Sequence, residues 1–270
     1  MPFFTVDGQP LHYIDQGTGP AVLLAGSYLW DQQMWAPQIA ALTPHYRVIA
    51  LDLWGHGESG RLPEGTTSLD DIARQALALL DHLAIDRVTL VGLSVGGMWG
   101  VRLAVTAPQR INGLVLMDTY AGSEPEPTRQ YYFALLKQIE DAGEISPQVL
   151  DIVVPIFFRP GIDPQSALYQ NFRASLAALP ADRLRESIVP MGRITFGRDD
   201  LLSRLNELNA ETTLVLCGDQ DQPRPPSEAR EMAELIGCPC VLVSEAGHIS
   251  NLDNPRFVTE ALLKFLAQRT

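Results

Sequence analysis

The sequence has few cysteines and little positive charge, and both shortages limit the kind of protein that it can be. Its three cysteines are Cys217, Cys238 and Cys240, and the last two belong to a Cys-Pro-Cys tripeptide. This spacing supplies neither a disulfide framework nor a set of zinc ligands, so we interpret the cysteines as reduced structural thiols. The formal net charge of −12 disfavours nucleic acid and anionic membrane surfaces as partners.

Long apolar runs and an early basic segment are also missing. No apolar run approaches the roughly 20 residues that cross a bilayer, and the first basic side chain is Arg47. A secretory signal would carry positive charge near its start. We therefore expect a cytoplasmic protein without a membrane partner. Its 270 residues suffice for one large domain or for a core with an inserted subdomain.

Apolar strands alternate with amphipathic helices over most of the chain. The predicted strands are Phe3–Val6, Leu11–Asp15, Ala21–Ala25, Arg47–Leu51, Val88–Gly92, Gly113–Met117, Thr213–Cys217 and Val241–Val243. The predicted helices are Met34–Leu42, Leu69–Leu83 with Ser68 as its N-cap, Val95–Ala107, Ser227–Ile236 and Arg256–Gln268. Continuous apolar strands joined by helices are typical of an α/β protein whose parallel sheet is covered on both faces.

The stretch from Tyr120 to Arg198 interrupts this alternation with several prolines and helical segments but no strand pattern. Open α/β sheets bind their ligands at the carboxyl edge of the strands. We therefore interpret residues 120–198 as a helical cap inserted above that edge, with residues 1–119 and 199–270 forming the core. The alternative is that its helices belong to the layers of the core.

A serine between two glycines follows the strand that ends near Gly92. The run Gly92-Leu93-Ser94-Val95-Gly96 lies between this strand and a helix rich in small residues. This arrangement is typical of a nucleophile elbow, in which a strained turn exposes the serine Oγ at a helix N-terminus. Backbone N–H groups at that end of a helix point toward a developing oxyanion. The sequence therefore predicts Ser94 as a nucleophile.

A serine hydroxyl needs a base within hydrogen-bond reach, and His248 is the histidine best placed to supply one. It lies in a loop between the last predicted strand and the last helix, in the run Glu245-Ala246-Gly247-His248. Such a loop emerges at the carboxyl edge, where Ser94 also lies. His56, in a glycine-rich loop, is interpreted as a structural residue.

The base in turn needs an orienting carboxylate, for which the chain offers three candidates. Asp219 and Asp221 both follow the strand that ends at Cys217, in the run Cys217-Gly218-Asp219-Gln220-Asp221. Asp221 lies deeper in the loop and is favoured over Asp219. Asp118, directly after the strand Gly113–Met117, is the third candidate.

Taken together, these motifs resemble those of the α/β-hydrolase fold over the whole chain. The resemblance is carried by Asp52-Leu53-Trp54-Gly55-His56-Gly57-Glu58-Ser59, Gly92-Leu93-Ser94-Val95-Gly96-Gly97-Met98, Gly218-x-x-Asp221 and Ala246-Gly247-His248-Ile249-Ser250-Asn251-Leu252. Within that superfamily the sequence is similar to 3-oxoadipate enol-lactonase-like proteins and small carboxylesterases. The resemblance implies a mostly parallel twisted sheet and a triad in the order Ser94, Asp221, His248, because the acid of this family follows the glycine by three residues. It implies neither a metal nor an organic cofactor.

The same resemblance implies an oxyanion hole formed by the backbone amides of Ser27 and Val95. The family usually carries His-Gly before the first of these donors, and here the match is Ala25-Gly26-Ser27, so the histidine is missing. The donor is a backbone group and does not depend on that side chain, but the bracing of its loop does. Four residues are predicted to line the substrate pocket: Tyr28, Leu29, Trp30 and Ile249.

Three functions are compatible with these residues. The favoured one is hydrolysis of carboxylic esters with small or medium acyl groups. The second is hydrolysis of an enol-lactone or of a C–C bond in a ring-fission product, whose carboxylates would favour basic cap residues at the pocket; the candidates are Arg129, Arg159, Arg173 and Arg193. The third is a small-molecule receptor with an intact triad. The expected partner is a small ester or lactone.

Overall fold

The computed structural model describes residues 2–269, and a single eight-stranded sheet runs through its centre in the order β1-β2-β4-β3-β5-β6-β7-β8. Its strands are β1 (Phe3–Val6), β2 (Gln9–Gln16), β3 (Ala21–Ala25), β4 (Arg47–Leu51), β5 (Val88–Leu93), β6 (Ile111–Met117), β7 (Thr213–Gly218) and β8 (Cys240–Val243). The pairs from β4 through β8 are parallel, while β1 and β2 join antiparallel at one end. The predicted α/β-hydrolase fold is therefore confirmed.

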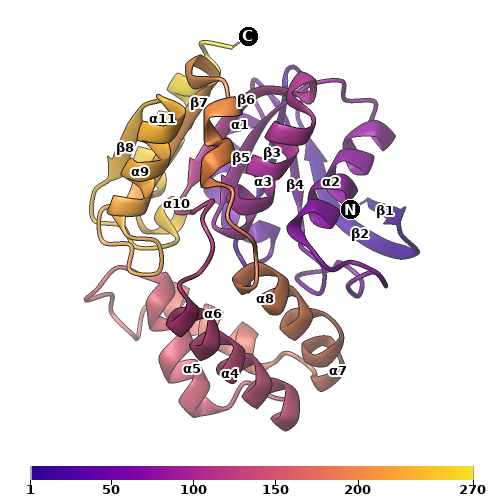
Figure 1. The fold of residues 1–270 in the computed structure, drawn as a ribbon, viewed down its shortest axis with the longest axis vertical. Helices are drawn as coiled ribbons and strands as arrows, with labels where there is room; N and C mark the ends of the chain where they lie inside the picture. The colour runs from indigo at the N-terminus through magenta and orange to yellow at the C-terminus, as the bar shows by residue number, and fades with distance from the viewer. Residues whose placement is uncertain (1, 270) are drawn as a thin grey trace.

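Helices cover both faces of this sheet (Figure 1). The helices of the core are α1 (Ala36–Leu42), α2 (Leu69–His82), α3 (Val95–Thr106), α9 (Pro226–Ile236), α10 (Ser250–Asp253) and α11 (Pro255–Leu266). Helix α3 packs against α2 and β5, α9 packs against β7, and α1 packs against α11. All six residues of β5 are buried, which explains its mainly apolar sequence.

The chain leaves the sheet after β6 and returns to it at β7. Between them lie α4 (Glu126–Ala142), α5 (Pro147–Val153), α6 (Ala167–Ala177), α7 (Ala181–Arg183), α8 (Val189–Phe196) and several turns of other helix types. Within residues 120–198, all of which are described, the structure contains no strand. Figure 1 shows these helices gathered at one end of the molecule, beyond the sheet. We call residues 120–198 the helical segment.

Local sequence signals account well for where the core helices begin. Ser68 caps α2 as predicted: its Oγ accepts the N–H of Asp71, and the Asp71 carboxylate accepts the N–H of Ser68. The predicted helix Met34–Leu42 is divided, because a 3₁₀ turn (Gln32–Trp35) comes before α1. Pro37 explains the division, since proline lacks an N–H and is tolerated only in the first turn of an α-helix.

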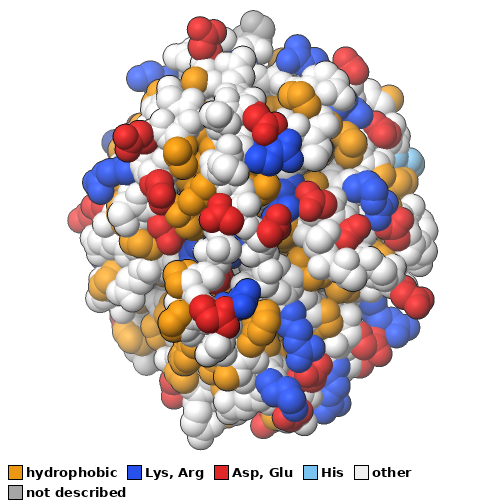
Figure 2. Space-filling view, in the orientation of Figure 1, with side chains coloured by type: hydrophobic (Ala, Val, Ile, Leu, Met, Phe, Trp, Pro, Cys, Tyr) orange, Lys and Arg blue, Asp and Glu red, His pale blue; other side chains and the backbone are white. Residues whose placement is uncertain are grey.

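The surface mixes both signs of charge with apolar atoms. Figure 2 shows acidic and basic side chains interspersed over this face, and hydrophobic atoms gathered where α4 and α5 lie in Figure 1. The large exposed hydrophobic residues of these two helices are Tyr131 and Ile152. Among residues 2–269, no helix has the length and hydropathy that crossing a membrane would require.

Candidate active site

The turn after β5 holds Ser94 in a conformation that few non-glycine residues adopt. Its backbone angles are φ 55° and ψ −121°, a strained combination that persists only where the surroundings enforce it. The neighbouring glycines are required by close approach: a Cβ on Gly96 would lie 2.2 Å from the carbonyl oxygen of Ala25, and one on Gly92 would lie 2.5 Å from that of Gly96. The small residues around Ser94 therefore let the strand and helix meet closely enough to form the turn.

Three predicted side chains meet at the carboxyl edge of the sheet. The Oγ of Ser94 lies 2.9 Å from Nε2 of His248, and Nδ1 of His248 lies 3.0 Å from Oδ2 of Asp221. Each of the three residues is less than a tenth exposed. The arrangement forms a continuous hydrogen-bonded chain from hydroxyl to imidazole to carboxylate, in which the imidazole can take the hydroxyl proton while the carboxylate holds its opposite nitrogen.

The other two candidate acids hold the loops around this chain rather than the imidazole. The Asp219 carboxylate accepts the N–H of Ala246, and the N–H of Gln220 donates to the carbonyl of Ala246. These bonds join the loop that carries Asp221 (the acid loop) to the loop that carries His248. Asp118 accepts the N–H of Gly218 and contacts the hydroxyl of Ser250. Asp221 is thus the candidate that the structure brings to His248.

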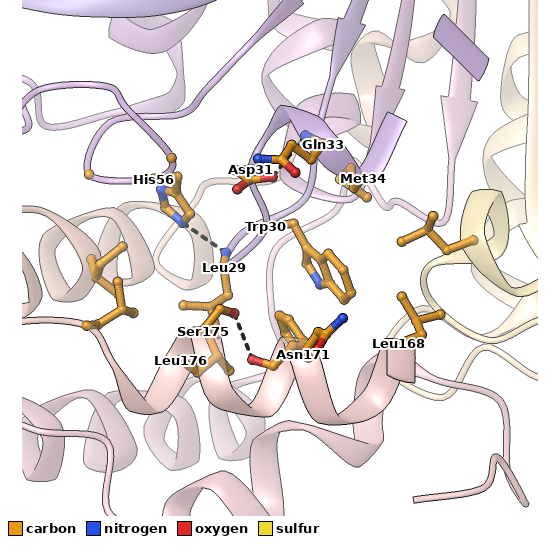
Figure 3. Close-up of a pocket in the computed structure, with 16 residues that line it drawn as sticks. Leu29, Trp30, Asp31, Gln33, Met34, His56, Leu168, Asn171, Ser175 and Leu176 are labelled. Carbon is orange, nitrogen blue, oxygen red and sulfur yellow. Dashed lines mark hydrogen bonds between the residues drawn. The ribbon is translucent and has the colours of Figure 1, made fainter. Parts of the chain in front are cut away.

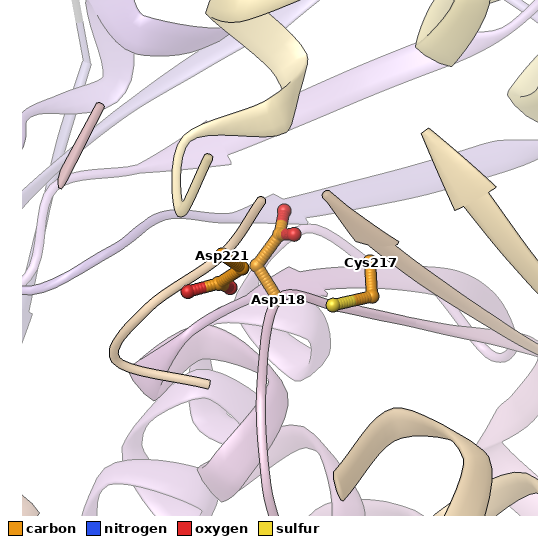
Figure 4. Close-up of side chains that lie close together, drawn as sticks. All are labelled: Asp118, Cys217 and Asp221. Atoms are coloured by element: carbon orange, nitrogen blue, oxygen red, sulfur yellow. The ribbon is translucent and has the colours of Figure 1, made fainter. Parts of the chain in front are cut away.

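Asp118, Cys217 and Asp221 form a compact buried group whose ligand atoms lie within 4.8 Å of one another (Figure 4). Burial and the nearby Asp221 carboxylate raise the pKa of Asp118 well above its usual value. Burial also raises the pKa of the Cys217 thiol, which keeps the sulfur protonated. Because the carboxylates already accept internal hydrogen bonds and the thiol is a poor donor of electrons in this form, the group does not fit a metal site.

The two predicted oxyanion donors belong to residues near Ser94: Val95 follows it in the chain, and Ser27 lines the same cavity. Val95 is the first residue of α3, so its N–H has no partner within the helix. The N–H of Ser27 lies 3.4 Å from the sulfur of Met34, a weak acceptor that a carbonyl oxygen can replace.

The loop that carries Ser27 is braced by His56. The N–H of Leu29 donates to Nε2 of His56 at 2.9 Å, and Nδ1 of the same ring lies 2.9 Å from the carbonyl of Trp54. Burial lowers the pKa of His56 to about 4, so its ring is neutral and can accept this bond. His56 therefore holds a second loop as well as its own, and it supplies bracing where the family's usual histidine is missing.

One cavity borders the serine, and a second cavity adjoins the first. The reactive cavity, of about 50 Å³, is lined by Ser27, Tyr28, Ser94, Met98, Glu124, Tyr132, Ile156, Phe157, Thr195, Phe196, Pro223, Arg224 and His248. The apolar cavity, of about 150 Å³, shares Tyr28, Tyr132, Ile156, Phe157 and Phe196 with it. Exposed Tyr131 and Ile152 also line the apolar cavity, which therefore reaches the surface over α4 and α5.

The four predicted pocket residues are distributed differently from expectation. Tyr28 lines the reactive cavity and Leu29 lines the apolar cavity. Trp30 instead lines a third cavity of about 470 Å³ (Figure 3). Its ring stacks on that of Phe172 of α6, with the two ring centroids 4.0 Å apart. Ile249 is fully buried and borders none of these three cavities. Its place beside His248 in the sequence does not bring its side chain to the substrate space.

The sequence did not predict a cluster of buried charged side chains at the reactive cavity. The carboxylate of Glu124 receives Nη1 of Arg198 on one oxygen and Nη2 of Arg224 on the other, both at 2.8 Å. Glu228 lies 3.5 Å from Nε of Arg224, and burial raises the pKa of this glutamate to about 7 although Arg224 opposes the shift. No local signal marks Glu124, because it lies about a hundred residues from Arg224 in the sequence.

The four arginines that were candidates for a basic residue at the pocket lie elsewhere. Arg129 pairs with Glu126, Arg173 with Asp151 and Arg193 with Glu140, all on the helical segment. These three arginines do not border the reactive or the apolar cavity, and Arg159 does not border them either. None of the four candidates for a basic residue at the pocket is therefore placed there. The side chains of Arg129, Arg173 and Arg193 are instead paired with acidic neighbours.

The comparisons with known proteins agree with this architecture. The Alpha/beta hydrolase family matches residues 21–261, so the chain belongs to that family. Hydrolase is accordingly its general class, and the predicted resemblance to enol-lactonase-like proteins is confirmed by the relatives below.

Two sequence relatives span most of the chain. It is 28% identical to 3-oxoadipate enol-lactonase 2 of Acinetobacter baylyi over 92% of this chain and 88% of the relative. It is 30% identical to a putative carbamate hydrolase, RutD, of Caulobacter segnis over 97% of both chains.

Solved structures show the same similarity. A thermophilic esterase from Thermogutta terrifontis, described with malate bound, superimposes with a TM-score of 0.86 at 27% identity, covering 97% of this chain and 95% of the esterase. The enol-lactonase from Burkholderia xenovorans also gives a TM-score of 0.86 at 27% identity, covering 98% of this chain and all of that one.

Proposed function

We propose that this protein is a serine hydrolase that cleaves carboxylic esters of small or medium acyl groups. The observation that carries the proposal is the unbroken array from Ser94 through His248 to Asp221 in a buried cavity. Similarity to an esterase and to an enol-lactonase supports ester-type carbonyl chemistry.

The first half of the reaction acylates the enzyme. As Ser94 Oγ bonds to the ester carbonyl carbon, its proton passes to Nε2 of His248, while Asp221 holds the opposite nitrogen. The carbonyl electron pair moves onto oxygen, which receives the N–H groups of Ser27 and Val95. When the carbonyl re-forms, the bond to the alcohol oxygen breaks and that oxygen takes the proton from His248.

Water completes the second half. His248 accepts a proton from water as the water oxygen attacks the acyl carbon, and the Ser94 oxygen leaves with that proton. The products are a carboxylic acid and the free enzyme. These steps need only groups of the protein and water, and no cofactor takes part.

We further propose that residues 120–198 act as a cap that selects the substrate. Phe157 lies 5.7 Å from the ring of His248, and its carbonyl accepts the N–H of Ile249. The apolar cavity is comparable in volume to an engineered cavity of about 150 Å³ that binds benzene. A group of about six carbons therefore suits it.

An enol-lactone hydrolase is the second candidate. It is favoured by the named lactonase relatives and by the charged side chains at the reactive cavity. Hydrolysis of a C–C bond in a ring-fission product belongs to the same alternative.

Purified protein treated with a fluorophosphonate and assayed on p-nitrophenyl esters of graded length, with lactones alongside, tests the proposal. We expect labelling of Ser94 and turnover of neutral esters. An acid lactone preferred by more than about a hundredfold would replace the ester assignment. Labelling of Ser94 without turnover of any ester or lactone would instead favour a small-molecule receptor.

A further inference from the structure

The turn after β6 contacts both loops that carry the partners of the nucleophile. Oδ1 of Asp118 accepts the N–H of Gly218 at 2.7 Å, in the acid loop just before Asp221. Oδ2 of the same carboxyl lies 2.5 Å from Oγ of Ser250, which closely follows His248 in the chain. One buried side chain therefore fixes the end of β6 against the acid loop and against the loop that carries His248.

The residues on either side of Asp118 hold the turn that carries the nucleophile. The hydroxyl of Thr119 donates to the carbonyl of Ser94 at 2.6 Å. The N–H of Ser94 donates to the carbonyl of Met117 at 2.9 Å. The short stretch from Met117 to Thr119 thus contacts the loops of all three triad residues.

Asp118 and Asp221 bring two carboxyl groups close together in a buried space (Figure 4). One oxygen of each lies within 4.8 Å of the other and of the sulfur of Cys217. Burial raises the pKa of the Cys217 thiol, which keeps this third group uncharged. Two negative charges at such a separation, shielded from water, strongly disfavour each other. One of the two carboxyls therefore keeps its proton.

The surroundings of the two carboxyls decide which one is charged. Asp221 faces Nδ1 of His248 at 3.0 Å and accepts the N–H of Arg224, also at 3.0 Å, so an imidazolium formed in the reaction stabilises its charge. Asp118 is fully buried, and no basic side chain among residues 2–269 pairs with it. Burial and the charge of Asp221 raise the pKa of Asp118 well above its usual value. The proton therefore belongs on Asp118.

We propose that Asp118 is a positioning residue of the triad, which as a neutral carboxylic acid ties both loops to β6 and leaves Asp221 as the only charged carboxyl of the pair. The inference rests on the proposed hydrolase function and adds to it a residue that touches neither the substrate nor the reacting atoms. In this form one oxygen accepts from Gly218 and the other donates its proton to Ser250. A second negative charge would favour the protonated imidazole, which cannot act as the base.

Asp118→Asn tests the charge while keeping the hydrogen bonds. Its amide is uncharged at every pH, offers an acceptor to Gly218 and a donor to Ser250, and tolerates the positive φ of 47° at this position. We expect kcat/KM for a p-nitrophenyl ester to stay within about threefold of wild type, with the midpoint of its acid limb moving less than about 0.3 pH unit. Loss of a charged Asp118 would instead lower that midpoint by about one pH unit, because the imidazolium would lose a nearby negative charge.

Asp118→Ala removes both hydrogen bonds and tests the positioning role. We expect kcat to fall by about tenfold to a hundredfold, with little change in KM, because small displacements of reacting groups have effects of this size. Ser250→Ala removes one bond and should cost less. Asp71→Ala is the control for a general loss of stability: it removes the carboxylate that accepts the N–H groups of Thr67 and Ser68, so it should lower the melting temperature and leave kcat unchanged.

Infrared spectroscopy reads the proton on Asp118 without any substrate. The difference spectrum between wild type and Asp118→Asn at pH 7 should contain the C=O band of a protonated carboxyl, which shifts in heavy water. A carboxylate band in its place would overturn the proposal. This measurement needs only the conservative variant, so it holds even if Asp118→Ala does not fold.

The kinetic results can also contradict the proposal. A fall of the acid-limb midpoint by about one pH unit in Asp118→Asn would mean that Asp118 is charged. A loss of kcat as large in Asp118→Asn as in Asp118→Ala would mean that the hydrogen bonds do not carry the effect. Unchanged kcat in Asp118→Ala would remove the positioning role.

A failure of the hydrolase assignment gives a different pattern. No ester would then turn over, and fluorophosphonate would not label Ser94 in the wild type. The proton resonance of the His248 N–H that faces Asp221 then replaces activity as the readout. Its presence in Asp118→Asn and its loss in Asp118→Ala would support the positioning role, and the same signal in both variants would refute it.

Discussion

The carboxyl edge of the sheet and the helical segment build the two sides of the reactive cavity by different means. The sheet edge supplies Ser94, Asp221 and His248 from turns whose backbone is fixed by hydrogen bonds and close glycine contacts. The helical segment supplies side chains from several helices and turns, chiefly aromatic and aliphatic ones. Reactive geometry therefore depends on short motifs, whereas the shape of the substrate space depends on the packing of residues far apart in sequence.

The largest expected effect tests the sheet side directly. Ser94→Ala removes the attacking oxygen, and kcat should fall by about a millionfold, as for the nucleophile of other serine hydrolases. The circular dichroism spectrum and melting temperature measure whether the fold survives, which we expect. Near-normal turnover, or a fluorophosphonate adduct on another serine, would remove Ser94 from the mechanism.

The next prediction separates the two aspartates of the acid loop. Asp221→Asn should lower kcat by about 10,000-fold, because an amide favours the wrong imidazole tautomer. Asp219→Asn weakens only the tie to Ala246 and should cost far less. Steady-state kinetics on one ester measure both variants. A larger loss in Asp219→Asn would transfer the orienting role to that residue.

Between the two sides lies the Ser27 loop, which His56 holds. His56→Leu leaves the N–H of Leu29 unpaired, and a misplaced oxyanion donor should lower kcat by about tenfold to a hundredfold. His56→Gln offers an acceptor and should recover part of the loss. Equal activity in wild type and His56→Leu would show that the loop needs no such brace.

The same residue gives a pH signature. Burial lowers the pKa of His56 to about 4, against about 6.5 for histidine in an unfolded chain. Between these values the unfolded state binds more protons, so the contribution of neutral His56 is complete above about pH 6.5 and is lost as pH falls toward 4. Melting temperatures measured across this window should fall less steeply on acidification in His56→Gln than in the wild type.

The helical side is tested by substrate length. Each methylene buried in the apolar cavity should raise kcat/KM about fourfold, from roughly 0.8 kcal/mol per group, until the cavity is full. Leu136→Phe, on α4, should shift the optimum to shorter chains. The labelling rate of Ser94 by a small fluorophosphonate serves as the control and should not change. If the chain length with the highest kcat/KM is the same in Leu136→Phe as in the wild type, the substrate chain does not occupy this cavity.

The smallest effect concerns Glu228. Burial raises the pKa of this carboxyl to about 7 from a usual 4.5, so between these values the folded state binds more protons. Stability should therefore decline as pH rises through this window, and Glu228→Gln should escape the decline. The variant should melt higher than wild type at pH 8 but not at pH 4.5. The opposite order would mean that pairing with Arg224 outweighs desolvation.

The contrast between the sheet edge and the helical segment also explains which features of the structure could be predicted from the sequence. Strand and helix patterns predicted the sheet and its covering helices, because their periodicity reports local burial. They missed the start of β2 at Gln9, since Pro10 is unusual in strands and is accommodated here by pairing with the edge strand β1. The division of residues 120–198 from the core stays a prediction about domains, although their helical content agrees with it.

At the site, the residues identified from sequence are those with a local signature. Ser94 is flanked by glycines, and His248 and Asp221 lie in loops after predicted strands. Trp30 is close to Ser27 in the sequence, which is why the sequence predicts it in the pocket. The backbone turns sharply at Leu29, where φ is 71°, and the Trp30 side chain that follows packs on Phe172. Neighbouring residues in a sharp turn need not share a direction.

By itself, the sequence determined the α/β class, the elbow at Ser94 and the order of the three residues that meet there, because each depends on local propensity and on where strands end. The tertiary structure alone decided that Glu124 joins Arg198 and Arg224 and that His56 braces a distant loop. It also decided that Arg129, Arg173 and Arg193 pair with acidic residues away from the cavity. Contacts of this kind join side chains whose sequence neighbours carry no common pattern. They exist only once packing has fixed the positions of separate elements.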